Sequence, residues 1–259
     1  MAKAPVGVLL LHGLTSHLDC IDPVVPILEK HGLPYRMPVL RGHMTKPEDL
    51  DGVKWQEWVE DGQKALDDLL QECDKVLPVA LSMGSLVALN LALNNPGKLE
   101  GLVAIAPALK LKTRLAPFIP VIARFQKFYT YKYDPKGYFD QEQARTTRNY
   151  PGLPTSALVE FVRMGQHLRN PALLAKIKIP TLVIATVHDR TIDPRTALFL
   201  YNNLGSADKK LIWFDRSGHE MLRDAQRGEV VTAIEAFVVS HTGVAPTEVA
   251  HSEATGQTS

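Results

Sequence analysis

Apolar and polar positions follow two periods along this chain, which predicts strands that alternate with helices. Short continuous apolar runs are typical of parallel strands buried on both faces. Such runs predict strands at 6–11, 35–37, 75–81, 99–106, 180–186 and 210–214. Stretches with apolar residues every three or four positions predict helices at 22–30, 55–70, 83–94, 194–204 and 222–239.

The alternation lapses between residues 111 and 178, where helical patterns recur at 118–129, 142–150 and 155–168. We therefore expect an α/β fold with a mainly parallel sheet flanked by helices. The expected core consists of residues 1–110 and 179–242, and residues 111–178 form a helical cap insertion. The tail from 243 to 259 has no periodicity and little to bury, so we expect it to be disordered.

A serine lies where the third long apolar run turns into a helical pattern. Ala80, Ser82 and Gly84 form a small-x-Ser-x-small arrangement, which leaves room for a sharp strand-to-helix turn. The nucleophile elbow has the form G-x-S-x-G, and here alanine replaces the first glycine. Such a pattern also arises by chance, and Ser82 could simply cap a helix.

A serine nucleophile needs a base to take its proton and an acid to orient that base. Asp189 follows the strand at 180–186, and His219 follows the last strand. The order Ser, Asp, His is that of an α/β-hydrolase sheet, whose strand ends meet at one edge. Asp193 is a rival for the acid, but it precedes Pro194 and helix capping explains it. The alternative is that Asp189 only stabilises a turn and that His219 is an ordinary loop residue.

Acyl transfer also needs donors for the oxyanion that forms. The backbone N–H of Met83 follows the serine at the start of a helix, where free N–H groups collect. The second donor is expected at Leu14, in the loop after His12-Gly13. That loop could instead be a simple strand-ending turn. His43 is expected to stabilise its own loop, and lining the site is the other interpretation.

Composition narrows the function classes. The net charge is +1, which favours neither nucleic acid nor an anionic membrane as a partner. Two cysteines, Cys20 and Cys73, form no disulfide framework, which fits a reducing compartment, and we expect a cytoplasmic protein. No signal peptide is recognisable, and no apolar stretch reaches the roughly 18 residues of a membrane span. No metal cluster or phosphate loop is evident, so no metal and no cofactor is expected.

These motifs together resemble the α/β-hydrolase superfamily, and within it the small bacterial carboxylesterases and monoacylglycerol lipases. The segments that carry the resemblance are 7–17, 41–43, 80–85, 188–194 and 216–221. The resemblance implies Ser82 as nucleophile, Asp189 as acid and His219 as base, with Leu14 and Met83 supplying the oxyanion N–H groups. The family often has glycine at the positions of Ala80, Met44 and Ser85, and Met44 puts the entrance loop in question.

The expected function is hydrolysis of short- to medium-chain carboxylic esters through an acyl-enzyme intermediate, with a small-molecule ester as the partner. Phe118, Ile122 and Phe125 have helical spacing in the cap and are expected to line an acyl pocket. Packing of the cap on the core is the alternative for these residues. A monoacylglycerol lipase, an acyltransferase on the same triad and a non-catalytic receptor are the rival functions. The sequence leaves the oligomeric state open.

Overall fold

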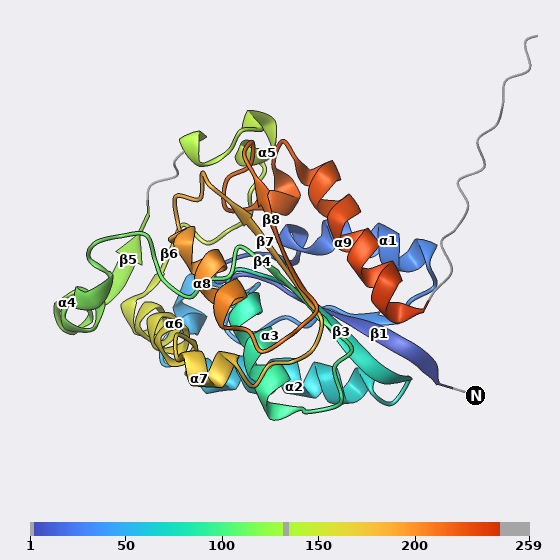
Figure 1. Ribbon diagram of the computed structural model, residues 1–259. Helices are drawn as coiled ribbons and strands as arrows, with labels where there is room; N and C mark the ends of the chain where they lie inside the picture. The colour runs from blue at the N-terminus through green and yellow to red at the C-terminus, as the bar shows by residue number, and fades with distance from the viewer. Residues whose placement is uncertain (1–2, 132–134, 244–259) are drawn as a thin grey trace, which may run out of the picture.

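Six parallel strands form the central sheet of the structure, a computed structural model that describes residues 3–131 and 135–243 (Figure 1). The spatial order is β2-β1-β3-β4-β7-β8, so β1 lies between β2 and β3. The strands are β1 (Ala4–Leu11), β2 (Tyr35–Arg36), β3 (Cys73–Leu81), β4 (Leu102–Ile105), β7 (Thr181–Thr186) and β8 (Lys209–Phe214). The predicted, mainly parallel sheet is confirmed.

Helices cover both faces of this sheet (Figure 1). One face carries α1 (Val25–Lys30) and α9 (Arg227–Thr242), and the other carries α2 (Trp55–Leu69), α3 (Met83–Asn94) and α8 (Arg195–Asn203). Within β1, Val8 and Leu10 belong to the apolar cluster with α1 and α9, whereas Leu9 and Leu11 belong to the cluster with α2 and α3. Successive side chains of a strand point to opposite faces, so a strand covered on both needs an unbroken apolar run.

Short 3-10 helices occur in the loops of the core segments. They are η1 (Leu18–Cys20), η2 (Asp22–Val24), η3 (Pro47–Leu50) and η6 (Met221–Arg223). The segment between β4 and β7 contains η4 (Ala116–Phe118), α4 (Ile119–Phe125), β5 (Phe128–Thr130), η5 (Pro135–Gly137), α5 (Gln141–Arg145), β6 (Gly152–Pro154), α6 (Thr155–Leu168) and α7 (Pro171–Leu174). Helix α6 packs on α2 and α3, and its buried Phe161 and Met164 join their apolar cluster. The cap boundaries at 111 and 178 stay a prediction.

Two of the predicted cap helices differ from the structure. The helix expected over 118–129 ends at Phe125, and β5 follows it and pairs antiparallel with β6. Aromatic and β-branched residues at 128–130 suit a strand, and pairing with β6 overrides the helical period. The helix expected over 142–150 ends at Arg145, and the N–H of Tyr150 donates instead to the carbonyl of Thr15, so a tertiary contact takes the place of the last helical turn.

The expected disordered tail, apart from Gly243, lies outside the described residues. Across the described ranges, no helix combines the length and the apolar character needed to cross a membrane.

The turn from β3 into α3 depends on close contact with β1. Ser82 adopts φ 55° and ψ −114°, in the positive-φ region that L-residues rarely occupy. A Cβ added at Gly84 would lie 2.3 Å from the carbonyl oxygen of Leu11 and 2.7 Å from that of His12. The backbone of α3 therefore passes directly beneath the end of β1, and only glycine leaves enough room at this position.

Replacing Gly84 by alanine should destabilise the fold by about 3 kcal/mol or more, because rigid backbone on both sides blocks the added methyl group. Gly228→Ala is the matched control, since a Cβ there meets no atom within 4 Å. Denaturant unfolding of both variants measures the difference. Equal stability of Gly84→Ala and the wild type would contradict the packing described for the turn.

Candidate active site

Ser82 is held at the carboxyl edge of the sheet by hydrogen bonds on both sides of the turn. Its backbone N–H donates to the carbonyl of Ile105 over 2.8 Å. The fully buried hydroxyl of Ser85 donates to the carbonyl of Ala80 over 2.9 Å and lies 3.2 Å from that of Ile105. Ser85, which stands where the family often has glycine, thus bridges the end of β3 to β4.

Three residues that are far apart in the sequence form one hydrogen-bonded chain. His219 Nε2 lies 2.9 Å from Ser82 Oγ, and His219 Nδ1 lies 2.7 Å from Asp189 Oδ2. All three side chains follow strands β3, β7 and β8, whose carboxyl ends meet at one edge. The arrangement is that of a nucleophile, a base and an orienting acid.

The carboxylate of Asp189 is fixed by its own loop. Its Oδ1 accepts hydrogen bonds from the N–H groups of Thr191 and Ile192, both at 2.8 Å. The side chain of Lys112 donates to the Asp189 carbonyl over 2.5 Å, and Leu111 forms a bridge with Ile192. The loop that carries Asp189 is therefore hydrogen-bonded to the first residues of the segment between β4 and β7.

Two opposing effects act on His219. Burial by itself would lower its pKa, because the charged imidazolium is poorly solvated inside the protein. The charge of Asp189 and the hydrogen bond to it outweigh burial, and the pKa of His219 is raised above its usual value. A raised pKa means that the site stabilises an imidazolium, which is the state that forms when a base has taken a proton from serine.

The rival acid is engaged elsewhere. Asp193 accepts from Arg195 through Nε at 2.9 Å and Nη2 at 2.6 Å, and Lys110 lies 3.5 Å away. The hydrogen bond from Arg195 lowers the pKa of Asp193 to about 2. His188, which precedes Asp189, is exposed and packs on the ring of Phe139 at 5.2 Å between centroids.

The loop after β1 lies against the nucleophile. A Cβ added at Gly13 would lie 3.4 Å from the Cβ of Ser82, so the two backbones are close neighbours. Leu14 lines the cavity at Ser82. Met83 is the first residue of α3, and the first N–H groups of a helix have no partner within it. Leu14 and Met83 thus both lie next to Ser82, and their role as oxyanion donors stays a prediction.

Two buried histidines, His12 and His43, stabilise the loop after β1. His12 Nε2 accepts from the N–H of Leu40 over 3.1 Å, so its proton resides on Nδ1, which donates to the Gly13 carbonyl over 2.9 Å. His43 Nδ1 donates to the carbonyl of Leu40 over 3.0 Å, and its ring meets that of His12 edge-on at 4.7 Å. Burial lowers the pKa of His12 to about 3 and that of His43 to about 4.

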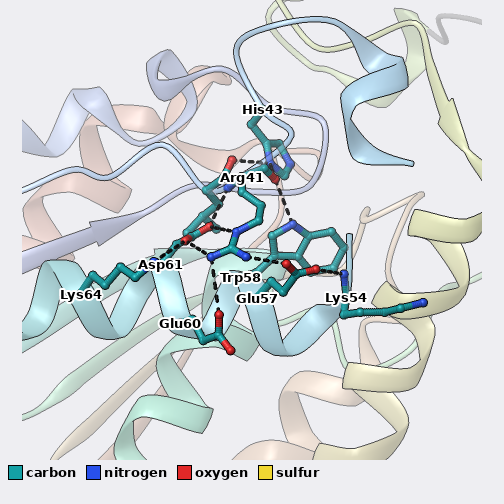
Figure 2. A network of polar contacts seen from close by, with 9 residues as sticks. Arg41, His43, Lys54, Glu57, Trp58, Glu60, Asp61 and Lys64 are labelled. Carbon is teal, nitrogen blue, oxygen red and sulfur yellow. Dashed lines mark hydrogen bonds and ion pairs between the residues drawn. The ribbon is translucent and has the colours of Figure 1, made fainter. Parts of the chain in front are cut away.

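Arg41 ties the loop after β2, which also carries His43, to α2. Figure 2 shows its guanidinium lying over the helix, where it forms a bidentate pair with Asp61, at 3.1 and 2.7 Å, and a bond to Glu57 at 2.5 Å. Trp58 Nε1 donates to the Arg41 carbonyl over 3.1 Å. Bidentate pairs fix direction as well as distance. His43 is therefore held in place from α2, which agrees with a structural role for it.

Met44 adopts φ 56°, which glycine would occupy without strain. The other non-glycine residues with positive φ in the described part of the chain are Thr15, Ser82 and Ala106. They follow strands β1, β3 and β4, so the backbone strain gathers at the site edge.

The neutral state of His12 and His43 makes stability depend on pH. Because the folded protein resists protonation of both rings, the unfolded chain binds protons first as the pH falls below 6.5. The free energy of unfolding should therefore fall by about 1 kcal/mol per pH unit for each histidine, down to about pH 3 for His12 and about pH 4 for His43. Urea unfolding at several pH values should show a shallower fall in His43→Gln than in the wild type. Equal slopes would refute the assignment.

A single large cavity opens at Ser82. It has a volume of about 720 Å³, within the range of small-molecule sites. Its apolar wall consists of Leu14, Leu81, Leu111, Leu115, Ile119, Ile122, Leu153, Leu158 and Phe161. Polar residues also line the cavity, and Tyr138, Thr147, Asn149 and His219 gather around Glu220 at its polar end.

Of the residues expected to bind substrate, Ile122 lines this cavity and Phe118 and Phe125 do not. Phe118 is 59% exposed and Phe125 is 86% exposed. The inward stripe of α4 runs through Ile119, Ile122 and Gln126, and a helix turns by about 100° per residue. Phe118 and Phe125 each precede a member of that stripe by one position, and both are exposed.

Asp224 is a residue that the sequence did not point to. It is fully buried, and its Oδ1 accepts from the N–H groups of Phe139 at 2.8 Å and Asp140 at 2.7 Å. Its Oδ2 accepts from the N–H of Gly218 at 2.6 Å. The loop that carries His219 is thereby joined to the segment at 137–140. No sequence pattern could have indicated this, since the bonds are made to distant backbone groups.

Glu220 and Asn149 were also missed. Both line the polar end of the cavity, and Asn149 donates to the Glu220 carboxylate. The position of Glu220 directly after His219 was the available signal. Among residues 3–131 and 135–243, no group of three or more His, Cys, Asp or Glu side chains is arranged to hold a metal ion.

Comparison with known proteins identifies the family. Residues 3–226 match the Hydrolase_4 family, described as serine aminopeptidase S33. The chain belongs to this family. It is 26% identical to a thermostable monoacylglycerol lipase of Bacillus sp. (strain H-257), with 93% of each chain covered. It is 23% identical to a carboxylesterase of Bacillus subtilis (strain 168), with 90% of this chain and 92% of that protein covered.

Solved structures show the same fold. One, described with LipS and LipT, two metagenome-derived lipolytic enzymes, has a TM-score of 0.83 at 23% identity and covers 93% of this chain and 96% of that one. A soluble variant of monoglyceride lipase from Saccharomyces cerevisiae has a TM-score of 0.78 at 17% identity, covering 93% and 88%. The predicted resemblance and the α/β-hydrolase fold are confirmed, and the matches confirm the expected enzyme class, a serine ester hydrolase.

Proposed function

We propose that this enzyme hydrolyses short- to medium-chain carboxylic esters with Ser82 as nucleophile, His219 as base and Asp189 as the orienting acid. One observation carries the proposal: the hydrogen-bonded chain from Asp189 through His219 to Ser82 opens into an apolar cavity. The relatives that span the whole fold are named as a monoacylglycerol lipase and a carboxylesterase. We propose esters of uncharged acyl groups as substrates because the wall at the serine is apolar.

In the proposed mechanism, His219 Nε2 takes the hydroxyl proton while Ser82 Oγ attacks the ester carbonyl carbon. The resulting oxyanion accepts hydrogen bonds from the N–H groups of Leu14 and Met83. His219 then gives its proton to the alcohol oxygen, the C–O bond breaks, and the acyl group remains on Ser82. Water attacks this acyl-enzyme with the help of His219 and releases the acid.

In the same proposal, residues 111–178 act as a cap over the serine. Leu111, Leu115, Ile119 and Ile122 come from this segment and line the cavity. The acyl group would therefore lie between the cap and the nucleophile. Short and medium chains fit a cavity of about 720 Å³ that the cap walls on one side.

Ser82→Ala should lower kcat for p-nitrophenyl butyrate by at least about 1,000-fold, because it removes the hydroxyl that lies 2.9 Å from His219 Nε2. Ser240→Ala, on the surface helix α9, is the matched control and should retain activity. Labelling with a fluorophosphonate should follow the same pattern. Undiminished turnover or labelling in Ser82→Ala would overturn the proposed nucleophile.

Asp189→Asn should lower kcat about 1,000- to 10,000-fold, since an amide facing Nδ1 favours the wrong tautomer of His219. Loss of the negative charge should also move the acid limb of kcat/KM to lower pH, because the carboxylate is what raises the pKa of His219 against burial.

Asp193→Asn tests the rival acid in the same assay. Asp193 pairs with Arg195, so its replacement should leave the acid limb where it is in the wild type. A shift of the limb in Asp193→Asn, with none in Asp189→Asn, would exchange the two assignments.

A further inference from the structure

A buried carboxylate without a cationic partner lies at the polar end of the cavity. Glu220 follows His219 and is 7% exposed. Its Oε1 accepts from the side-chain amide of Asn149. Its Oε2 is buried and has no hydrogen-bond partner within the described part of the chain, and no ion pair to Glu220 is present there.

A second unpaired acceptor lies beside it. Asn149 Oδ1 is buried and likewise finds no donor among residues 3–131 and 135–243. Carboxylate and amide oxygens can only accept hydrogen bonds. A group that completes this end of the cavity must therefore donate at least two hydrogen bonds, and a single hydroxyl offers only one.

The charges around Glu220 are already balanced by other partners. Arg223 donates to Asp19 over 3.0 Å and to the Thr146 hydroxyl over 2.8 Å. Asp224 is satisfied by backbone N–H groups. Glu220 is therefore a buried acid that forms no ion pair within the described residues, although its charge helps to raise the pKa of His219. Burying an unpaired carboxylate is strongly unfavourable, which favours a ligand that brings a positive charge.

Tyrosine rings surround the same end. Tyr131, Tyr138 and Tyr150 line the cavity. Burial, followed by the nearby charge of Glu220, raises the pKa of Tyr138 above its usual range, so this hydroxyl is a neutral neighbour of the carboxylate. Apart from His219, whose pKa the charge of Glu220 helps to raise, the neighbours named here bring no positive charge to the carboxylate.

The direction of the substrate follows from the proposed mechanism. The alcohol oxygen must reach His219 Nε2 to receive its proton, so the alcohol part of the ester lies beside the base. The acyl part then contacts the apolar wall. Glu220 and Asn149, on the polar side of the cavity, face the alcohol part.

We propose that Glu220, Asn149 and Tyr138 form a subsite for a protonated primary amine carried by the alcohol part of the ester. An ammonium group donates three hydrogen bonds, which suffices for Glu220 Oε2 and Asn149 Oδ1, and its charge pairs with the carboxylate. This inference rests on the proposed ester hydrolysis and specifies the class of ester.

Matched phenyl butyrates test the subsite. Esters of 4-(aminomethyl)phenol, 4-(hydroxymethyl)phenol and 4-ethylphenol differ only in the terminal group, and their 3-substituted isomers sample a second distance. The ring prevents transfer of the acyl group to the amine within the substrate. The readout is the ratio of kcat/KM for the aminomethyl ester to that for the ethyl ester, which corrects for the general activity of each variant.

Glu220→Gln keeps the shape of the side chain and removes its charge. It should lower this ratio at least about 10-fold, the size expected when a charged hydrogen bond is lost. Glu235→Gln, which changes an acid on the outer helix α9, should leave the ratio unchanged. An unchanged ratio in Glu220→Gln overturns the subsite. A preference for the hydroxymethyl ester that Glu220→Gln abolishes overturns the amine and assigns a hydroxyl.

Direct binding separates this inference from the proposed function. Calorimetry with Ser82→Ala should show tighter binding of 4-(aminomethyl)phenol than of 4-ethylphenol, and adding Glu220→Gln should remove the difference. Binding that discriminates, in a protein that hydrolyses none of the esters, keeps the amine subsite and overturns the ester hydrolase. Binding without discrimination overturns the subsite even where the esters are hydrolysed.

Discussion

The contact between Gly84 and the end of β1 is the constraint on which the rest of the site depends. With a hypothetical Cβ only 2.3 Å from the Leu11 carbonyl, α3 starts as close to the sheet as a backbone allows. That proximity forces Ser82 into its positive-φ conformation and brings the loop of Gly13 against it. One steric condition thus places Ser82 at a sharp strand-to-helix turn, next to the loop that contains Leu14. The loops that carry His219 and Asp189 then complete the hydrogen-bonded chain to a serine whose position is already fixed.

Those two loops are steadied by the segment between β4 and β7. Lys112 and Leu111 fasten the loop of Asp189, and Asp224 joins the loop of His219 to residues 139 and 140. The same segment supplies the apolar wall of the cavity. Geometry of the base and shape of the pocket therefore depend on one another, so a change in the cap segment can alter turnover without touching the serine.

The polar groups around the site differ in whether their hydrogen bonds are satisfied. Below the oxyanion loop, His12 is neutral and fully hydrogen-bonded, and Arg41 is matched by carboxylates of α2 (Figure 2). These groups make the loop rigid. At the polar end of the cavity, Glu220 and Asn149 keep acceptors without donors in the described structure. Glu220 and Asn149 line the cavity, and it is there that we propose a ligand contributes the missing donors.

The sequence by itself determined the parallel sheet, the core helices and the three residues that meet at Ser82. Each can be recognised from the spacing of apolar residues or from the end of an apolar run, and both signals come from residues close together in the sequence. It failed at 128–130, where pairing with β6 overrides a helical pattern, and at Phe118 and Phe125, which lie one position off the inward stripe of α4. Only the tertiary structure decided the roles of Asp224, Lys112 and Glu220. Their partners are backbone groups and side chains from distant segments, and no local pattern encodes which segments the fold brings together.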